Sequence, residues 1–258
     1  GLRFAHGGAQ LAVCAELAGV LEAWFTEEYG RRREEARAPQ SEWVPIFVCS
    51  LSAPFIPTPL HVFEPRYRLM MRRCLEGNQR FGMCLPSADE QRDFADTGTM
   101  LFIDRFEQLP DGRSMVGTRG VSRFSVVERG VLDGYATALI QPYEEDAQGF
   151  PLSNDFGAEA TALHRGAEAL LASMQQGPSM MSKRFKSRLD HQLGPLPAPG
   201  SPQFGAHVSF YMAQLFSVLG DPDEAAELVF LQPEADRWLR LVRTFARMEP
   251  FRAELRAF

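Results

Sequence analysis

The sequence predicts an α+β fold in which a strand-rich region precedes a helical one. Residues 43–143 contain short runs of apolar and β-branched residues separated by turn residues, a pattern typical of β-strands. After residue 148, apolar side chains recur at intervals of three and four, as in amphipathic helices. The 258 residues, 45% of them hydrophobic, are enough to form a packed core. We divide the chain into a helical linker (1–40), a strand-rich subdomain (41–148) and a helical subdomain (149–258).

The amino-terminal segment, residues 10–38, is predicted to be one amphipathic helix. Its apolar residues lie three or four positions apart, so one face should pack against another surface. The arginines at 31–33 suit the carboxyl end of a helix, and Pro39 marks its stop. Because the sequence begins with Gly1 rather than methionine, we expect it to be a fragment in which this helix connects to an upstream module.

Six strands are predicted in the strand-rich region. One pair should form a hairpin, because Pro110 pre-sets a turn dihedral and Gly112 accepts a positive φ at low cost. Residues 100–103 are apolar on both faces of their strand, so we expect both faces to be covered, by closure of the sheet or by another layer. The predicted strands span 44–49, 80–85, 99–109, 113–118, 121–128 and 135–141.

A helix is predicted to interrupt the strands at residues 65–76. Glu64 can serve as its amino-terminal cap, Pro65 suits the first helical position, and Gly77 suits the stop. The helix should lie on the surface with one face docked. Helical periodicity places Leu69, Met70 and Cys74 on the inner side and spreads Arg66, Arg68, Arg72 and Arg73 around the remainder.

The region after residue 148 is predicted to contain several helices and a proline-rich loop at 193–202. The helix at 205–219 is apolar around most of its circumference, which indicates a central position among the others. Pro250 should kink or end the last helix. The predicted helices span 154–174, 182–192, 205–219, 223–231 and 234–257.

The sequence contains no recognisable catalytic or metal-binding motif. Lys183 and Lys186 are the only lysines, which excludes a phosphate-binding loop of the form Gly-x4-Gly-Lys-Ser/Thr. Ser179 with Lys183 is the nearest approach to a serine–lysine dyad, but a helix boundary explains these residues without chemistry. The chain is therefore predicted to be neither an enzyme nor a carrier of a metal or cofactor. Lacking the spacing of zinc ligands, the cysteines are expected to be buried free thiols: Cys14, Cys49, Cys74 and Cys84.

The charge distribution argues against a nucleic acid or a membrane as the partner. The net charge is −6 and the isoelectric point is near 5.5, which disfavours a broad surface for polyanions. The basic cluster of Lys183, Arg184, Lys186 and Arg188 is interpreted as a solvated helix face. No apolar run reaches the roughly 20 residues that span a bilayer, and the chain does not open on a signal peptide. We expect a soluble, intracellular protein of the cytoplasm or nucleus.

Several separated blocks resemble, in their order and spacing, the amino-terminal domain of the Lon protease. The blocks are VPIFVC at 44–49, PLHVFEPRYRLM at 59–70, FGMC at 81–84 and GRS at 112–114. They are most similar to the domain as it occurs in eukaryotic proteins that join a RING finger to a Lon domain, and the resemblance covers roughly residues 11–250. It implies a PUA-like, β-rich pseudo-barrel followed by a carboxyl-terminal helical bundle.

The resemblance also implies a non-catalytic module that recognises protein clients. In the RING proteins, which act as ubiquitin ligases or protein quality-control factors, clients would be presented to a ubiquitin-charged conjugating enzyme. In the ATP-dependent Lon protease they pass to an ATPase and a peptidase. This chain contains neither the RING cysteines nor the ATPase–peptidase, so it would be the client-binding part of either kind of protein. Since PUA-like folds also bind RNA and small ligands, a module of that kind is the alternative.

The block at 59–67 has two interpretations. In the structural one, prolines stiffen the approach to the helix and the glutamate caps it, so that the block only builds the fold. In the functional one, a groove between the strand-rich and helical parts holds an extended peptide, through strand addition. The structural residues are Pro59, Glu64 and Pro65, and the substrate-binding residues are His61, Phe63, Arg66 and Tyr67.

Overall fold

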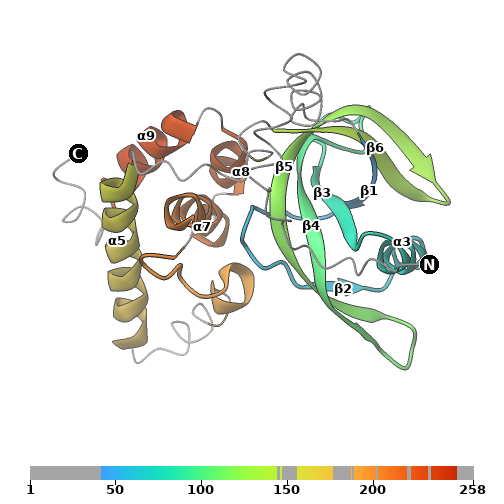
Figure 1. Cartoon of the computed structure of the whole chain (residues 1–258), viewed down its shortest axis with the longest axis horizontal. Helices are drawn as coiled ribbons and strands as arrows, with labels where there is room; N and C mark the ends of the chain where they lie inside the picture. Colours follow the sequence, from blue (N-terminus) through green and yellow to red (C-terminus); the bar gives the residue numbers. More distant parts are fainter. Residues whose placement is uncertain are drawn as a thin grey trace, which may run out of the picture. The chain divides into compact units, whose positions relative to one another are not determined.

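The computed structural model describes residues 42–143, 146, 156–176, 187, 189–201, 203–219, 222–231 and 234–248. These residues belong to one compact unit, Gln40–Phe258, which contains both the strands and the helices (Figure 1). The predictions made for the linker at 1–40, for Cys14, for Ser179 and for the four residues of the basic cluster lie outside the described residues.

The strands form one sheet that closes on itself, and the α+β class is confirmed. The order is β2-β5-β4-β3-β1-β6, and β6 pairs with β5 as well as with β1. Among the strands of the described residues, β1 and β3 run parallel to each other and the other pairs are antiparallel. The strands are β1 (Glu42–Val48), β2 (Leu60–Val62), β3 (Arg80–Pro86), β4 (Phe94–Gln108), β5 (Ser114–Leu132) and β6 (Tyr135–Pro142).

The predicted break between strands at residues 118–121 is wrong, because β5 continues through it. Gly120 is needed there for a close approach of another segment: a Cβ on it would lie 2.0 Å from the carbonyl oxygen of Ala53. The Phe55 N–H donates to the Gly120 oxygen at 2.9 Å, and the Gly120 N–H donates to the oxygen of Ile56 at 3.0 Å. The glycine thus marks a crossing of two main chains rather than a turn.

The hairpin between β4 and β5 is confirmed. Gly112 has a φ of +82°, and the Leu109 N–H donates to the Arg113 oxygen at 2.8 Å across the turn. Met100 and Leu101 are buried as expected for a strand covered on both faces. Strand β2 was not predicted, because three residues that follow a proline-rich stretch are too short to show an alternating pattern.

Helix α3 (Pro65–Glu76) has the predicted bounds, and its buried side chains share a core with the inward-facing residues of the strands. Met70 and Cys74 are buried as predicted, but Leu69 is only half-buried. The full set of buried side chains on this helix is Tyr67, Met70, Met71 and Cys74.

The expectation that all cysteines are buried is wrong for Cys49, whose side chain is exposed. Burial raises the pKa of the Cys74 and Cys84 thiols to about 12. Both are therefore protonated at neutral pH and are poor nucleophiles.

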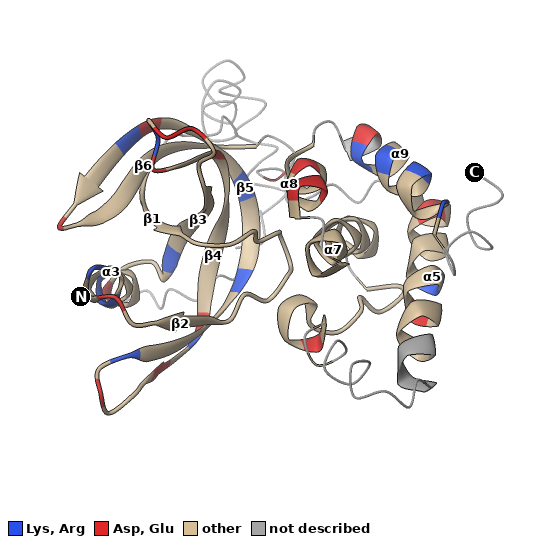
Figure 2. Ribbon diagram, turned by 180° about the vertical axis from the view of Figure 1, so that it is seen from behind, with Lys and Arg blue, Asp and Glu red and all other residues tan. Residues whose placement is uncertain are grey.

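The helical part is organised around α7 (Phe204–Leu219), which carries no charged residue and is buried over most of its length (Figure 2). Helix α7 therefore occupies the predicted central position. Around it lie α5 (Gly157–Gln176), α8 (Pro222–Phe230) and α9 (Glu234–Phe245). Helix α9 gives way to a turn at 246–248, earlier than predicted, and Pro250 lies outside the described residues.

The sheet and the helices meet at a buried arginine, and we call this contact the sheet–helix interface. Arg123 of β5 is fully buried, and its Nη2 lies 2.7 Å from Oδ1 of Asp146, which is also buried. Its Nη1 donates to the carbonyl oxygen of Val229 in α8 at 3.1 Å. The guanidinium carbon lies 5.0 Å from the ring centres of both Tyr143 and Phe210. One side chain thus connects a strand to two helices.

Candidate functional site

The register of three strands places a set of side chains on the exposed side of the sheet. Leu60, Val62 and Val116 are buried in the core. Because side chains alternate along a strand, the paired residues His61 and Met115 point to the opposite, exposed side of the sheet. On the other side of β5, β4 pairs with β5 through residues 105 and 107. We call the resulting surface the outer face; it consists of Pro59, His61, Phe63, Arg105, Glu107, Met115 and Gly117.

The outer face carries exposed apolar side chains beside its charged pair, where the solvated side of an antiparallel sheet is normally polar. Phe63 is 59% exposed and Met115 is 41% exposed. The rings of His61 and Phe63 lie 6.0 Å apart, so the aromatic surface is continuous along β2 and its extension. Exposed apolar side chains that lie together are typical of binding surfaces.

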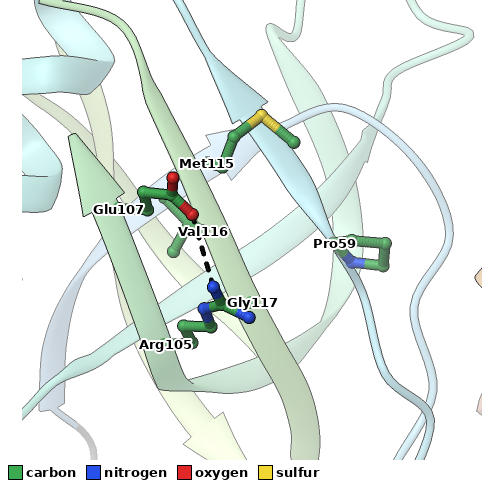
Figure 3. A pocket seen from close by; sticks show the side chains of 6 residues that line it. All are labelled: Pro59, Arg105, Glu107, Met115, Val116 and Gly117. Carbon is green, nitrogen blue, oxygen red and sulfur yellow. Dashed lines mark hydrogen bonds and ion pairs between the residues drawn. The ribbon is translucent and has the colours of Figure 1, made fainter. Parts of the chain in front are cut away.

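A pocket of about 260 Å³ lies in the outer face above Gly117. Figure 3 shows Arg105 and Glu107 on one side of this glycine and Pro59 on the other. Arg105 and Glu107 are in ion-pair contact at 3.4 Å, so the charged wall of the pocket is internally neutralised. Gly117 contributes no side chain to the pocket, and a Cβ on it would lie 3.3 Å from Cβ of Arg105.

The start of α3 differs from the prediction in one respect. Glu64 occupies the position before the helix and its carbonyl oxygen accepts the first helical hydrogen bond, from the Arg68 N–H at 2.9 Å. Its side chain, however, makes no capping hydrogen bond and instead accepts one from Nε of Arg66 at 2.8 Å. Glu64 therefore occupies the predicted N-cap position but does not cap through its side chain, and Pro65 stands in the first turn as predicted.

Tyr67 belongs to the core and not to an exposed edge. Its side chain is 4% exposed, and its ring stacks on Phe47 at 4.1 Å between ring centres. Its hydroxyl accepts a hydrogen bond from the Val48 N–H at 3.3 Å, and burial raises its pKa. Arg66 is exposed and places its guanidinium over the outer side of the same ring, 4.6 Å from the centre. The proposed contact of Tyr67 with a ligand is thus incompatible with its burial.

The predicted location of the groove is also wrong. The block at 59–67 and α3 lie on the side of the sheet away from α7, α8 and α5 (Figures 1 and 2). The structure brings Pro59, His61 and Phe63 together with β4 and β5, not with the helices. Met115 and Gly117 were missed. The sequence places both residues on one face of the predicted strand at 113–118. It does not show that this face lies beside β2, because β2 was not predicted.

A second apolar surface lies over β1, β5 and β6. A pocket of about 420 Å³ is lined there by Trp43, 53% exposed, and by Val131, 70% exposed. The Trp43 ring lies against Gly130, where a Cβ would meet Cζ3 of the ring at 3.1 Å. This surface has exposed apolar side chains like the outer face. Here β6 is the shared neighbour, because β1 at 43–45 and β5 at 130–132 each pair with β6.

Among the described residues, no cluster of three histidine, cysteine, aspartate or glutamate side chains is arranged to hold a metal ion. A search of the same residues for helices long and apolar enough to cross a membrane finds none.

Residues 43–219 match the model of the protein family described as the ATP-dependent protease La (LON) substrate-binding domain. The chain belongs to this family. The match includes the whole outer face and extends to the end of α7, so that α8 and α9 lie beyond the part of the Lon domain that it covers.

One relative is the LON peptidase N-terminal domain and RING finger protein C14F5.10c of Schizosaccharomyces pombe. It is 38% identical over an aligned stretch of 118 residues, with 39% of this chain and 24% of the relative covered. This chain therefore spans about a quarter of the length of the relative that it matches.

Two solved structures share the fold. The Lon N-terminal domain protein from Xanthomonas campestris has a TM-score of 0.53 and 23% identity, with 78% of this chain and 98% of that chain covered. The N-terminal domain of the Mycobacterium avium complex Lon protease has a TM-score of 0.50 and 13% identity, with coverage of 78% and 97%. At these identities the likeness concerns the fold alone.

Proposed function

We propose that this chain is a non-catalytic module that binds extended segments of protein clients on its outer face. The observation that carries the proposal is that, within a Lon substrate-binding domain, an end strand of the sheet lies beside exposed Phe63 and the pocket above Gly117. Together these provide main-chain and side-chain contacts for a peptide, the two requirements of recognition by strand addition.

The hydrogen-bonding pattern of β2 supports strand addition. The Thr58 N–H donates to the oxygen of Thr118 at 2.7 Å. Because hydrogen-bonded pairs alternate along an antiparallel ladder, Leu60 and Val62 should bond to β5, and the main chain of His61 should point away from it. In the described part of the chain no strand pairs with β2 on that side. An added strand would find a donor and an acceptor at His61.

The side chains of the outer face would supply the remaining affinity. Phe63 and Met115 offer apolar contact, and the pocket above Gly117 can accept one apolar side chain of the client. Such a mode recognises an exposed, unfolded segment rather than a folded surface, because the peptide must be extended to pair with β2. This fits a chain that selects damaged or unfolded proteins.

In the whole protein we propose that the module serves a RING-type ubiquitin ligase or another protein quality-control factor of the cytoplasm or nucleus. The support is the relative from Schizosaccharomyces pombe, whose name combines this domain with a RING finger. A ubiquitin-conjugating enzyme would be engaged by that RING and not by this chain. Alternatively, the module is the substrate-binding part of an ATP-dependent Lon protease. A second alternative is that it binds RNA or a small ligand, as other PUA-like folds do.

Site-specific photocrosslinking tests the proposal. A benzophenone amino acid is placed at Phe63 (59% exposed) or, as a matched control, at Leu239 (49% exposed) on α9. The probe is reduced, carbamidomethylated lysozyme, which stays unfolded, compared with native lysozyme. We expect crosslinking at position 63 to the unfolded form only, and little at position 239. Equal yields at the two positions, or equal yields with native lysozyme, would show that the outer face is not a client site.

A further inference from the structure

Helix α3 is strongly basic in a chain whose net charge is −6. Its twelve residues include four arginines and a single glutamate. Arg66 pairs with Glu64 at 2.8 Å, and Arg73 pairs with the β5–β6 turn at 2.5 Å. Arg68 and Arg72, one helical turn apart, are both exposed. Among the residues that the structure describes, neither of these two guanidinium groups has an acidic partner.

The unpaired arginines adjoin the aromatic end of the outer face. The Arg68 guanidinium packs against the β4–β5 turn, where a Cβ on Gly112 would lie 2.3 Å from its Nη2. Strands β2 and β5 are in register at Val62 and Ser114, so Phe63 lies beside the strand end that leads into this turn. A peptide that runs along β2 past Phe63 would therefore meet Arg68 first and Arg72 one turn later.

We propose that the outer face selects client segments in which an acidic side chain lies close to the apolar residue that contacts Phe63. This rests on the proposed function and names the class of client. A guanidinium group donates two parallel hydrogen bonds to a carboxylate, which gives geometric selectivity as well as attraction. The net charge of −6 disfavours RNA, and the edge of β2 that is free in the described part of the chain offers a peptide main chain hydrogen bonds that an RNA backbone cannot complete as a strand.

Affinities of short fluorescent peptides test the selection. Each peptide carries one leucine flanked on its amino or carboxyl side by glutamate, glutamine or lysine. We expect a glutamate peptide to bind about three- to tenfold more tightly than its glutamine counterpart, as for two exposed ion pairs. The advantage should shrink in 1 M salt, where the screening length is about 3 Å. The side on which glutamate works best gives the direction of the peptide along β2.

Variants assign the effect to the two arginines. Arg68→Gln with Arg72→Gln should remove the preference for glutamate and leave affinity for the glutamine peptide within about twofold. Arg243→Gln, on exposed α9, is the matched control for loss of charge and should keep the preference. Arg68→Glu with Arg72→Glu should prefer the lysine peptide. A purely structural role of these side chains would not produce that reversal.

The outcomes separate this inference from the proposed function. Equal affinity for glutamate and glutamine peptides overturns the acidic selection but leaves client binding intact. Failure of every peptide to bind, with the photocrosslink also absent, overturns both. Tighter binding of polyuridine than of the acidic peptides, lost in Arg68→Gln with Arg72→Gln, would assign the basic helix to RNA instead.

Discussion

The sheet–helix interface and the outer face both combine aromatic rings with arginines, but these residues are buried at the interface and exposed at the outer face. At the interface, Arg123 is wholly buried and its charge is matched by Asp146. On the outer face, Phe63 is mostly exposed and Arg68 has no acidic partner in the described structure. The difference teaches that the same residue types stabilise the fold in one place and are left available for binding in the other.

Substitution of Arg123 should have the largest effect. Arg123→Met leaves the buried carboxylate of Asp146 without its partner, and we expect it to lower the free energy of unfolding by about 3–5 kcal/mol in urea denaturation. The matched control is Arg119→Met, on the same strand. Its ion pair with Asp104 is exposed, so it should cost no more than about 1 kcal/mol. Equal effects of the two substitutions would mean that the buried pair does not anchor the interface.

Acidification should destabilise the fold through His207 of α7. Burial lowers the pKa of His207 from 6.5 to about 4, and its ring packs tilted against Phe55 at 5.2 Å between ring centres. Between these pH values the unfolded chain binds a proton that the folded chain excludes, so the stability contributed by the neutral ring falls as the pH drops. Below pH 4 both states are protonated and this loss is complete.

The comparison of wild type with His207→Phe isolates this effect from carboxylates that titrate in the same range. Wild type should lose about 1–3 kcal/mol more than the variant when urea denaturation is repeated from pH 7 to pH 4. Parallel curves for the two proteins would contradict the assignment. His61→Gln, which removes an exposed histidine of the outer face, is the matched control and should lose as much stability as wild type over this pH range.

Phe63→Ser should give the smallest change in stability and a clear change in binding. We expect affinity for the unfolded lysozyme to fall about tenfold, as for a central interface aromatic, with an unfolding free energy within about 0.5 kcal/mol of wild type. Val131→Ser removes a similarly exposed side chain (70%) from the Trp43 surface and should leave the affinity unchanged. A greater loss from Val131→Ser would transfer client binding to that surface.

The sequence by itself determined the elements whose patterns are local. The bounds of α3 followed from Pro65 and Gly77, and the β4–β5 turn followed from Gly112. The central place of α7 followed from a circumference that is mostly apolar. The family followed from the order of separated blocks, since a succession of matches at fixed spacing specifies more than any single motif.

Only the tertiary structure decided which side of those elements faces solvent and what lies beside them. The pattern alone left open whether Tyr67 packs or binds, and burial against Phe47 places it in the core. Gly120 was interpreted as the end of a strand, because the sequence does not distinguish a glycine that allows two main chains to cross from a glycine that forms a turn. The outer face depends on the pairing of β2 with β5, residues 60–62 with 114–116. Contacts between such distant segments are set by register and packing, which no local pattern encodes.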